Sequence, residues 1–156
     1  MKKTILILLL AGLGLCAAAQ PRAIGLRAGY GLELSYQHAL DWPHFVEFDL
    51  GLDLQQGVRG TATYNIVVAE PNWGGGDWAW YVGPGASAGY VYETGTDRMD
   101  VMLAAVAQLG CEYSPTEHLG ISLDVRPMIG YHFGDTFYTS GLLRGFIPTL
   151  GIRFKF

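Results

Sequence analysis

Apolar and polar residues alternate along almost the whole chain after residue 22. In the stretch VEFDLGLD at 46–53, every second residue, beginning with the Val, is Val, Phe or Leu, and the residues between them are Glu, Asp or Gly. A period of two is typical of a β-strand with one apolar and one polar face. The pattern predicts an all-β protein of eight antiparallel strands, at 23–29, 32–40, 44–54, 58–69, 77–92, 98–113, 119–131 and 143–156.

Turn-forming residues separate these segments. They occur at 29–31, 41–43, 56–57, 71–76, 95–97, 114–116 and 134–141, where Gly, Pro, Asn, Asp and Ser gather. The longest connection is expected at 134–145. Pro84 lies inside the fifth segment, and because proline cannot donate to a strand ladder we expect a local bulge there.

The N-terminal stretch has the pattern of a secretory signal peptide. Lys2 and Lys3 precede an apolar run at 5–15, and three alanines follow at 17–19. The run is shorter than the roughly 20 residues of a spanning helix. A lipoprotein would be acylated at Cys16, but Leu15 stands where such processing sites carry a small residue. We therefore expect a signal peptide at 1–19 and a barrel domain at 20–156.

The orientation of the two strand faces decides the class of barrel. A soluble barrel buries its apolar face and exposes its polar one. Here the polar face is rich in glycine, which suits a crowded interior, and the apolar face carries aromatic residues near the strand ends, as a membrane interface requires. We therefore expect the apolar face to lie outside, against lipid, in an up-and-down transmembrane β-barrel.

Charged residues would then collect inside the barrel. An eight-stranded barrel is just wide enough for side chains to fill it, and buried charges must be paired. We therefore favour an ionic plug over a substrate or proton pathway. The residues expected in this lumen network are Arg27, Glu33, Glu47, Asp49, Asp53, Arg59, Glu112, Asp124, Arg126, Arg153 and Lys155.

The aromatic residues are expected in two interfacial belts. Both termini of an even-stranded barrel lie at one end, which we expect to be periplasmic, so the tryptophans near the even-numbered turns fall there. Tyrosines and phenylalanines mark the opposite interface. The principal members are Trp42, Trp73, Trp78 and Trp80 at the first, and Tyr90, Tyr131, Phe133 and Phe146 at the second.

Five short stretches carry a family resemblance: AIGLRAGYG, LSYQHAL, WYVGPGASAGYVY, LGISLDVRP and the terminal GIRFKF. In this order the chain resembles the small eight-stranded outer-membrane β-barrels common in Bacteroidetes, of the OmpA/OmpX-like, porin-like kind. The resemblance implies insertion into the outer membrane by the barrel assembly machinery, with Phe156 as part of the assembly signal. It implies lipid and lipopolysaccharide as surroundings, and it assigns no activity.

Charge and cysteine content exclude several classes. Without residues 1–19 the chain keeps 14 acidic residues against 8 basic ones, near −6, which argues against nucleic acid. One cysteine, Cys111, remains, so an internal disulfide and a Cys/His metal cluster are excluded. We expect no cofactor and no metal.

Two other functions stay open beside a structural, membrane-stabilising or surface-interaction role. An outer-leaflet lipid A hydrolase or acyltransferase would need a triad, for which His132, Ser140 and Asp135 are the candidates. No spacing marks them, so we expect a protein that is not an enzyme. An exported lipocalin-like binder would instead have an apolar lumen.

Overall fold

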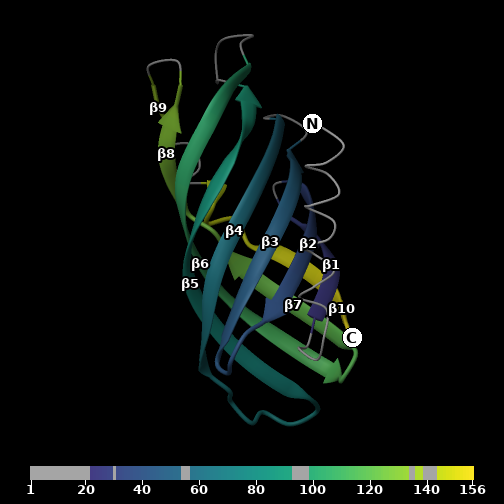
Figure 1. The fold of residues 1–156 in the computed structure, drawn as a ribbon. Helices are drawn as coiled ribbons and strands as arrows, with labels where there is room; N and C mark the ends of the chain where they lie inside the picture. Colours follow the sequence, from purple (N-terminus) through teal and green to yellow (C-terminus); the bar gives the residue numbers. More distant parts are fainter. Residues whose placement is uncertain (1–21, 30, 54–56, 93–98, 134–135, 139–143) are drawn as a thin grey trace, which may run out of the picture.

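A computed structural model describes residues 22–29, 31–53, 57–92, 99–133, 136–138 and 144–156. The predicted signal peptide at 1–19 lies outside them. Nearly all described residues belong to ten strands, drawn in Figure 1: β1 (Arg22–Ala28), β2 (Leu32–Ala39), β3 (His44–Asp53), β4 (Gly57–Ala69), β5 (Asp77–Tyr92), β6 (Met99–Thr116), β7 (Leu119–Val125), β8 (Met128–His132), β9 (Thr136–Tyr138) and β10 (Thr149–Lys155).

In the described part of the chain these strands form a closed antiparallel barrel of eight strand positions, each of which is called a wall below. Strands β7 and β8 both pair with β6 in one register and make a single wall interrupted at 126–127. Strands β9 and β10 share the last wall, since β9 pairs with β8 and β10 with β7. Pairing of β10 with β1 closes the barrel, as Figure 1 shows where the yellow strand lies beside the purple one.

The two ends of the barrel differ in which parts of the chain they carry, and the end with both termini is called the terminus end. At the terminus end, the backbone of Arg22 exchanges hydrogen bonds of 3.0 and 2.8 Å with that of Phe156. The turns at 40–43, 70–76 and 117–118 lie at the same end. The far end carries the connection from β1 to β2 and the strands β8 and β9, which lie at the upper left in Figure 1.

The faces of the strands are oriented as the alternation predicted. On β1, Leu26 is 56% exposed, whereas its neighbour Arg27 is 0% exposed. On β7, Leu123 is 53% exposed and Asp124 is 2% exposed. Apolar side chains therefore cover the outside and polar ones fill the interior, the reverse of a soluble barrel. The lipocalin-like alternative, which needs an apolar lumen, is wrong for this reason.

Glycine on the inward face is needed for space. A Cβ at Gly83 would overlap the carbonyl oxygen of Tyr64, and one at Gly110 would lie 2.5 Å from the ring of Tyr81. Both distances are below any that real side chains adopt. The interior is therefore packed tightly at these positions.

Three local expectations were wrong. Strand β6 continues to Thr116, through the turn expected at 114–116, because it still pairs with β7 there. The expected strand at 143–156 is ordered as β10 only from Thr149, and β9 lies inside the expected loop. Pro84 causes no bulge: the register of β5 with β4 and β6 is unchanged across it, and the irregularity lies at Val67/Ala69. Outward-facing Pro84 interrupts the β4–β5 pairing, because it has no N–H to donate, but it does not shift the register.

No helix in the described segments is long and apolar enough to cross a membrane.

Candidate functional site: an ionic network in the lumen

The strand register brings charged residues together across the inside of the barrel. Arg27 on β1 pairs with Glu33 on β2, and Glu33 pairs with Gly51 on β3. Gly51 in turn pairs with Arg59 on β4. Because Gly51 has no side chain, Glu33 can reach across it, and Arg59 Nη2 donates to Glu33 Oε1 at 2.9 Å. The polar residues at every second position of neighbouring strands thus form one continuous polar surface inside the barrel.

Glu47 on β3 is the centre of this network and is 0% exposed. Its Oε1 accepts hydrogen bonds from Arg27 at 3.0 Å, Arg126 at 2.8 Å and Arg153 at 2.6 Å. The Ser35 hydroxyl donates to the same oxygen at 3.0 Å. Three arginines from three different walls therefore share one carboxylate, which offsets a large part of their mutual repulsion.

Two aspartates complete the central layer. Asp49 Oδ2 accepts from Arg126 at 2.6 Å and from Arg27 at 3.4 Å. Asp124 on β7 accepts from the Arg27 Nη2 atom, and its Oδ1 lies 3.5 Å from Arg126 Nε. Each arginine of this layer thus contacts more than one acid, which is the arrangement that makes a buried charge tolerable.

The network continues from the centre toward both ends. Toward the far end, Glu33 links Arg126, at 3.4 Å, to Arg59. Toward the terminus end, Arg153 Nη1 donates to Glu112 Oε2 at 2.7 Å, and Lys155 Nζ lies 2.6 Å from Glu112 Oε1. Five cations and five anions therefore form one connected set among the described side chains.

A neutral polar cluster lies beside the charges. One end of the Gln108 amide lies 2.7 Å from Thr63 Oγ1 and 3.0 Å from the Asn65 side-chain nitrogen. The other end of the amide lies 2.9 Å from Arg126 Nη2, from which its oxygen accepts. Thr61 and Ser87 share a hydroxyl contact of 3.0 Å. These residues close the space between β4 and β6 that the ions leave.

Some buried polar atoms have no partner among the described residues. They are Arg27 Nε, Asp49 Oδ1, Ser122 Oγ, Arg59 Nε and Arg153 Nε in the lumen. Such atoms cost free energy when they are removed from water. The network therefore fills the lumen with equal numbers of positive and negative charges, although some of its hydrogen-bond donors and acceptors have no partner among the described residues.

The structure places ten of the eleven expected lumen residues in this network, each inward-facing and ion-paired. The side chain of Asp53 lies outside the described residues. So do the side chain of His132 and the whole of Asp135 and Ser140, the three candidates for a catalytic triad. The geometry of that triad therefore stays a prediction.

Most of the expected belt residues lie at the two ends. Trp73 contacts Trp78 and Trp80 with ring centroids 5.2 and 6.4 Å apart, at the terminus end. Trp42 lies in the turn between β2 and β3 at the same end. At the far end Tyr131 and Phe133 meet edge to face at 6.1 Å. Tyr90 is exposed at the same end, whereas the exposed Phe146 follows Gly145, which accepts a backbone hydrogen bond from Arg126 at the interruption between β7 and β8. Phe156 at the terminus end is 60% exposed.

An apolar cluster inside the barrel was not expected as such. Met102, Ala104 and Val106 on β6 face inward and pack with Met128 on β8, and each is at most 4% exposed. The alternation places Ala104 and Val106 on the inward face, but it did not predict that Met102 and Met128 pack together there. Met102 could have been found by following the inward-facing positions of β6, which are every second residue, back toward the start of the strand.

Comparisons with known proteins support the fold alone. No family model matches the chain, and no curated protein matches it. Among solved structures, the N-terminal β-barrel domain of Pseudomonas aeruginosa OprF is similar with a TM-score of 0.53 and 12% identity, covering 88% of this chain and 96% of that one. A de novo designed transmembrane β-barrel is similar with a TM-score of 0.40 and 13% identity, covering 87% and 93%.

The fold is thus that of an outer-membrane-type β-barrel with a polar, filled interior. An apolar exterior and a closed ladder are what a strand protein needs to lie in lipid, because every backbone group is then paired internally.

Proposed function

We propose that this protein is an outer-membrane β-barrel with a structural or surface-interaction role, and that its lumen is closed to solutes by the ionic network. The observation that carries the proposal is the reversed polarity of the wall combined with the connected ion pairs across the interior. A wide channel would need water where Arg27, Glu47 and Arg153 are now packed at 0–1% exposure.

The test is conductance in a planar lipid bilayer with the refolded barrel. We expect no steady ionic current, because the central layer leaves no continuous aqueous path. Release of a trapped sugar from lipid vesicles gives a second readout, and we expect none. Steady open-channel current through the wild-type protein, or rapid sugar release, would contradict a closed lumen.

Membrane insertion has its own test. We expect the protein extracted in detergent to migrate differently on a gel before and after boiling, since a closed barrel resists detergent at room temperature. Recovery of the protein in the soluble periplasmic extract with no shift on boiling would contradict the membrane location.

Several finer aspects belong to the same proposal. We infer export by a signal peptide, insertion by the barrel assembly machinery with Phe156 as part of the signal, a periplasmic terminus end, and contact with outer-membrane lipid and lipopolysaccharide. The kinship with small barrels of Bacteroidetes rests on the sequence resemblance. The proposed role is not enzymatic, and lipid A that keeps its acyl chains after incubation with the refolded protein is the expected result.

A further inference from the structure

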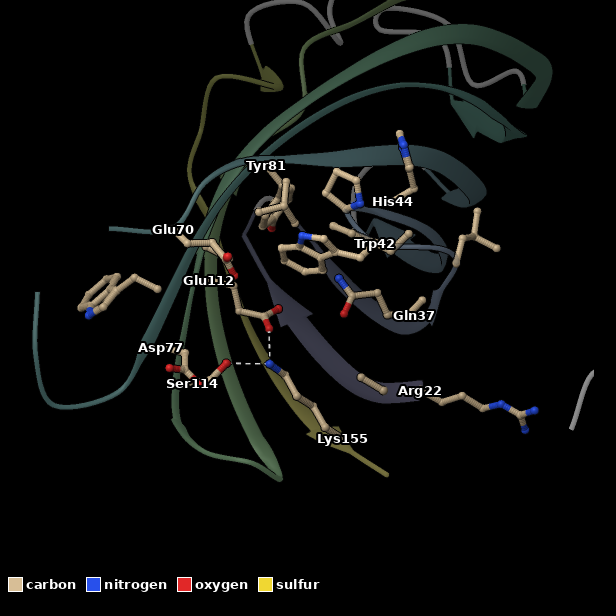
Figure 2. Close-up of a pocket in the computed structure, with 18 of the residues that line it drawn as sticks. Arg22, Gln37, Trp42, His44, Glu70, Asp77, Tyr81, Glu112, Ser114 and Lys155 are labelled. Carbon is tan, nitrogen blue, oxygen red and sulfur yellow. Dashed lines mark hydrogen bonds and ion pairs between the residues drawn. The ribbon is translucent and has the colours of Figure 1, made fainter. Parts of the chain in front are cut away.

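The terminus end of the barrel contains a cavity that the ionic network does not fill. Its volume is about 450 Å³, within the range of small-molecule sites. The lining comes from the β2–β3 turn, the end of β4, the start of β5 and the end of β6, together with Arg22 and Lys155 from the two strands that close the barrel. Figure 2 shows these residues around the open mouth.

Aromatic side chains form the floor and one side of this cavity. Tyr81 is 1% exposed and meets Phe45 edge to face, with ring centroids 5.3 Å apart. The Tyr81 hydroxyl donates to Asp124 at 3.4 Å, so the floor also separates the cavity from the ionic layer. In Figure 2 the indole of Trp42 extends over the mouth, near Tyr81 and Gln37, although Trp42 is 68% exposed.

The turn that carries Trp42 is held by the backbone. Leu40 N–H donates to the carbonyl of His44 at 2.9 Å, and His44 N–H donates to that of Asp41 at 2.9 Å. Val67 N–H of β4 donates to the carbonyl of Pro43 at 2.9 Å, which ties the turn to the neighbouring wall. The indole is therefore presented from a fixed loop, while the ring itself contacts little.

The charges around the cavity are mostly acidic. On the opposite side, Lys155 is fully engaged, with Glu112 at 2.6 Å and the Ser114 hydroxyl at 2.6 Å. The remaining carboxylates of the lining are Glu70, Asp77 and Glu117, and none of them has an ion pair with a described residue. In Figure 2 the Glu70 and Glu112 side chains lie on the same side of the cavity.

We propose that this cavity binds a small organic cation, an ammonium or guanidinium group attached to an apolar body. The apolar body would lie against Phe45 and the Trp42 indole, above the buried Tyr81, and the charge would lie between the indole and the free carboxylates. A cation near an aromatic face is favoured by the ring quadrupole, and a carboxylate adds ordinary Coulomb attraction. Anionic ligands would face three carboxylates that have no ion pair with a described residue, against the single further cation Arg22 in the described lining.

The experiment compares three ligands of one shape on the refolded wild-type barrel in nonionic detergent: phenethylammonium, the neutral 2-phenylethanol and the anionic 3-phenylpropanoate. All four tryptophans lie at the terminus end, so their fluorescence, excited at 295 nm, reports binding. We expect saturable change with the cation, at least tenfold weaker response with the alcohol, and none with the anion. Equal affinity for cation and alcohol, or no saturation by the cation, would overturn the proposal.

Variants locate the charge that is recognised. The double change Glu70→Gln with Asp77→Asn should weaken phenethylammonium binding about tenfold, since two nearby charges are removed. Asp100→Asn at the far end, at the second residue of β6, is the control and should leave binding unchanged. Each variant is checked by its gel shift on boiling. Equal weakening by the control, or unchanged binding by a folded double variant, would overturn the proposal.

Discussion

The interior of this barrel is built in two different ways. Around Glu47 the lumen is filled by charged side chains that reach across from opposite walls, whereas around Met102 it is filled by apolar side chains of β6 and β8. Both regions are equally buried, so burial alone does not select the chemistry. In the ionic region the contribution of a side chain to stability depends on charged partners on other strands. In the apolar region it depends on the volume that the side chain fills. The two should respond differently to conservative substitutions.

The largest effect is expected at Glu47. Glu47→Ala leaves three arginines around one empty position, and removing one partner of a buried ion pair costs about 3–5 kcal/mol. The free energy of unfolding, measured by urea titration in lipid vesicles with the boiling-dependent gel shift as readout, should fall by that amount. Glu47→Gln keeps the shape but not the charge and should also be harmful. A loss below 1 kcal/mol for both variants would show that the ionic region is not held by this carboxylate.

The next effect separates the inside from the outside of one strand. Leu123→Arg places a charge on the lipid face of β7 and should cost about 2–4 kcal/mol or block insertion. Asp124→Leu, one residue on, should permit insertion but lower the free energy of unfolding, because Arg27 loses a partner. Gel shift after vesicle refolding measures insertion and urea titration measures stability. If Leu123→Arg inserted as readily as the wild type, the assignment of the faces would be wrong.

The apolar region should show a smaller, volume-dependent effect. Met102→Ala removes a fully buried side chain and should cost about 2–3 kcal/mol in the same urea titration. Met102→Leu conserves volume and should cost less than about 1.5 kcal/mol. This tolerance is the contrast with Glu47→Gln. An equally large loss for Met102→Leu would remove the distinction between the two regions.

The smallest effect is expected at the terminus end of the network. Lys155 is 29% exposed and pairs with Glu112, which keeps Arg153 as a partner after Lys155→Ala. Water screens the pair, so the change in unfolding free energy should be about 1 kcal/mol or less. Glu117 is exposed and has no ion pair with a described side chain, so Glu117→Ala is the control and should be neutral. A loss comparable to that of Glu47→Ala would mean that the network acts as a single unit to its end.

Much of the fold was predictable from the alternation, because side chains of a strand must point to opposite faces and the pattern is almost unbroken. The orientation of the faces followed from glycine on the polar side, as Gly83 and Gly110 illustrate. The ends of the strands were less predictable. Thr116 remains paired although Ser-Pro-Thr looks like a turn, and Thr149 starts β10 later than expected, since cross-strand partners decide where a ladder ends.

The sequence by itself determined the strands, the two faces and the set of charges that enter the lumen, since all three depend on local period and residue type. Only the tertiary structure decided which charges meet. Glu47 and Arg153 are 106 positions apart, and Arg27 and Asp124 are 97 apart. Their contacts depend on the register of every intervening strand and on closure between β1 and β10. The cavity at the terminus end has the same origin, because its lining comes from six segments that only barrel closure brings together.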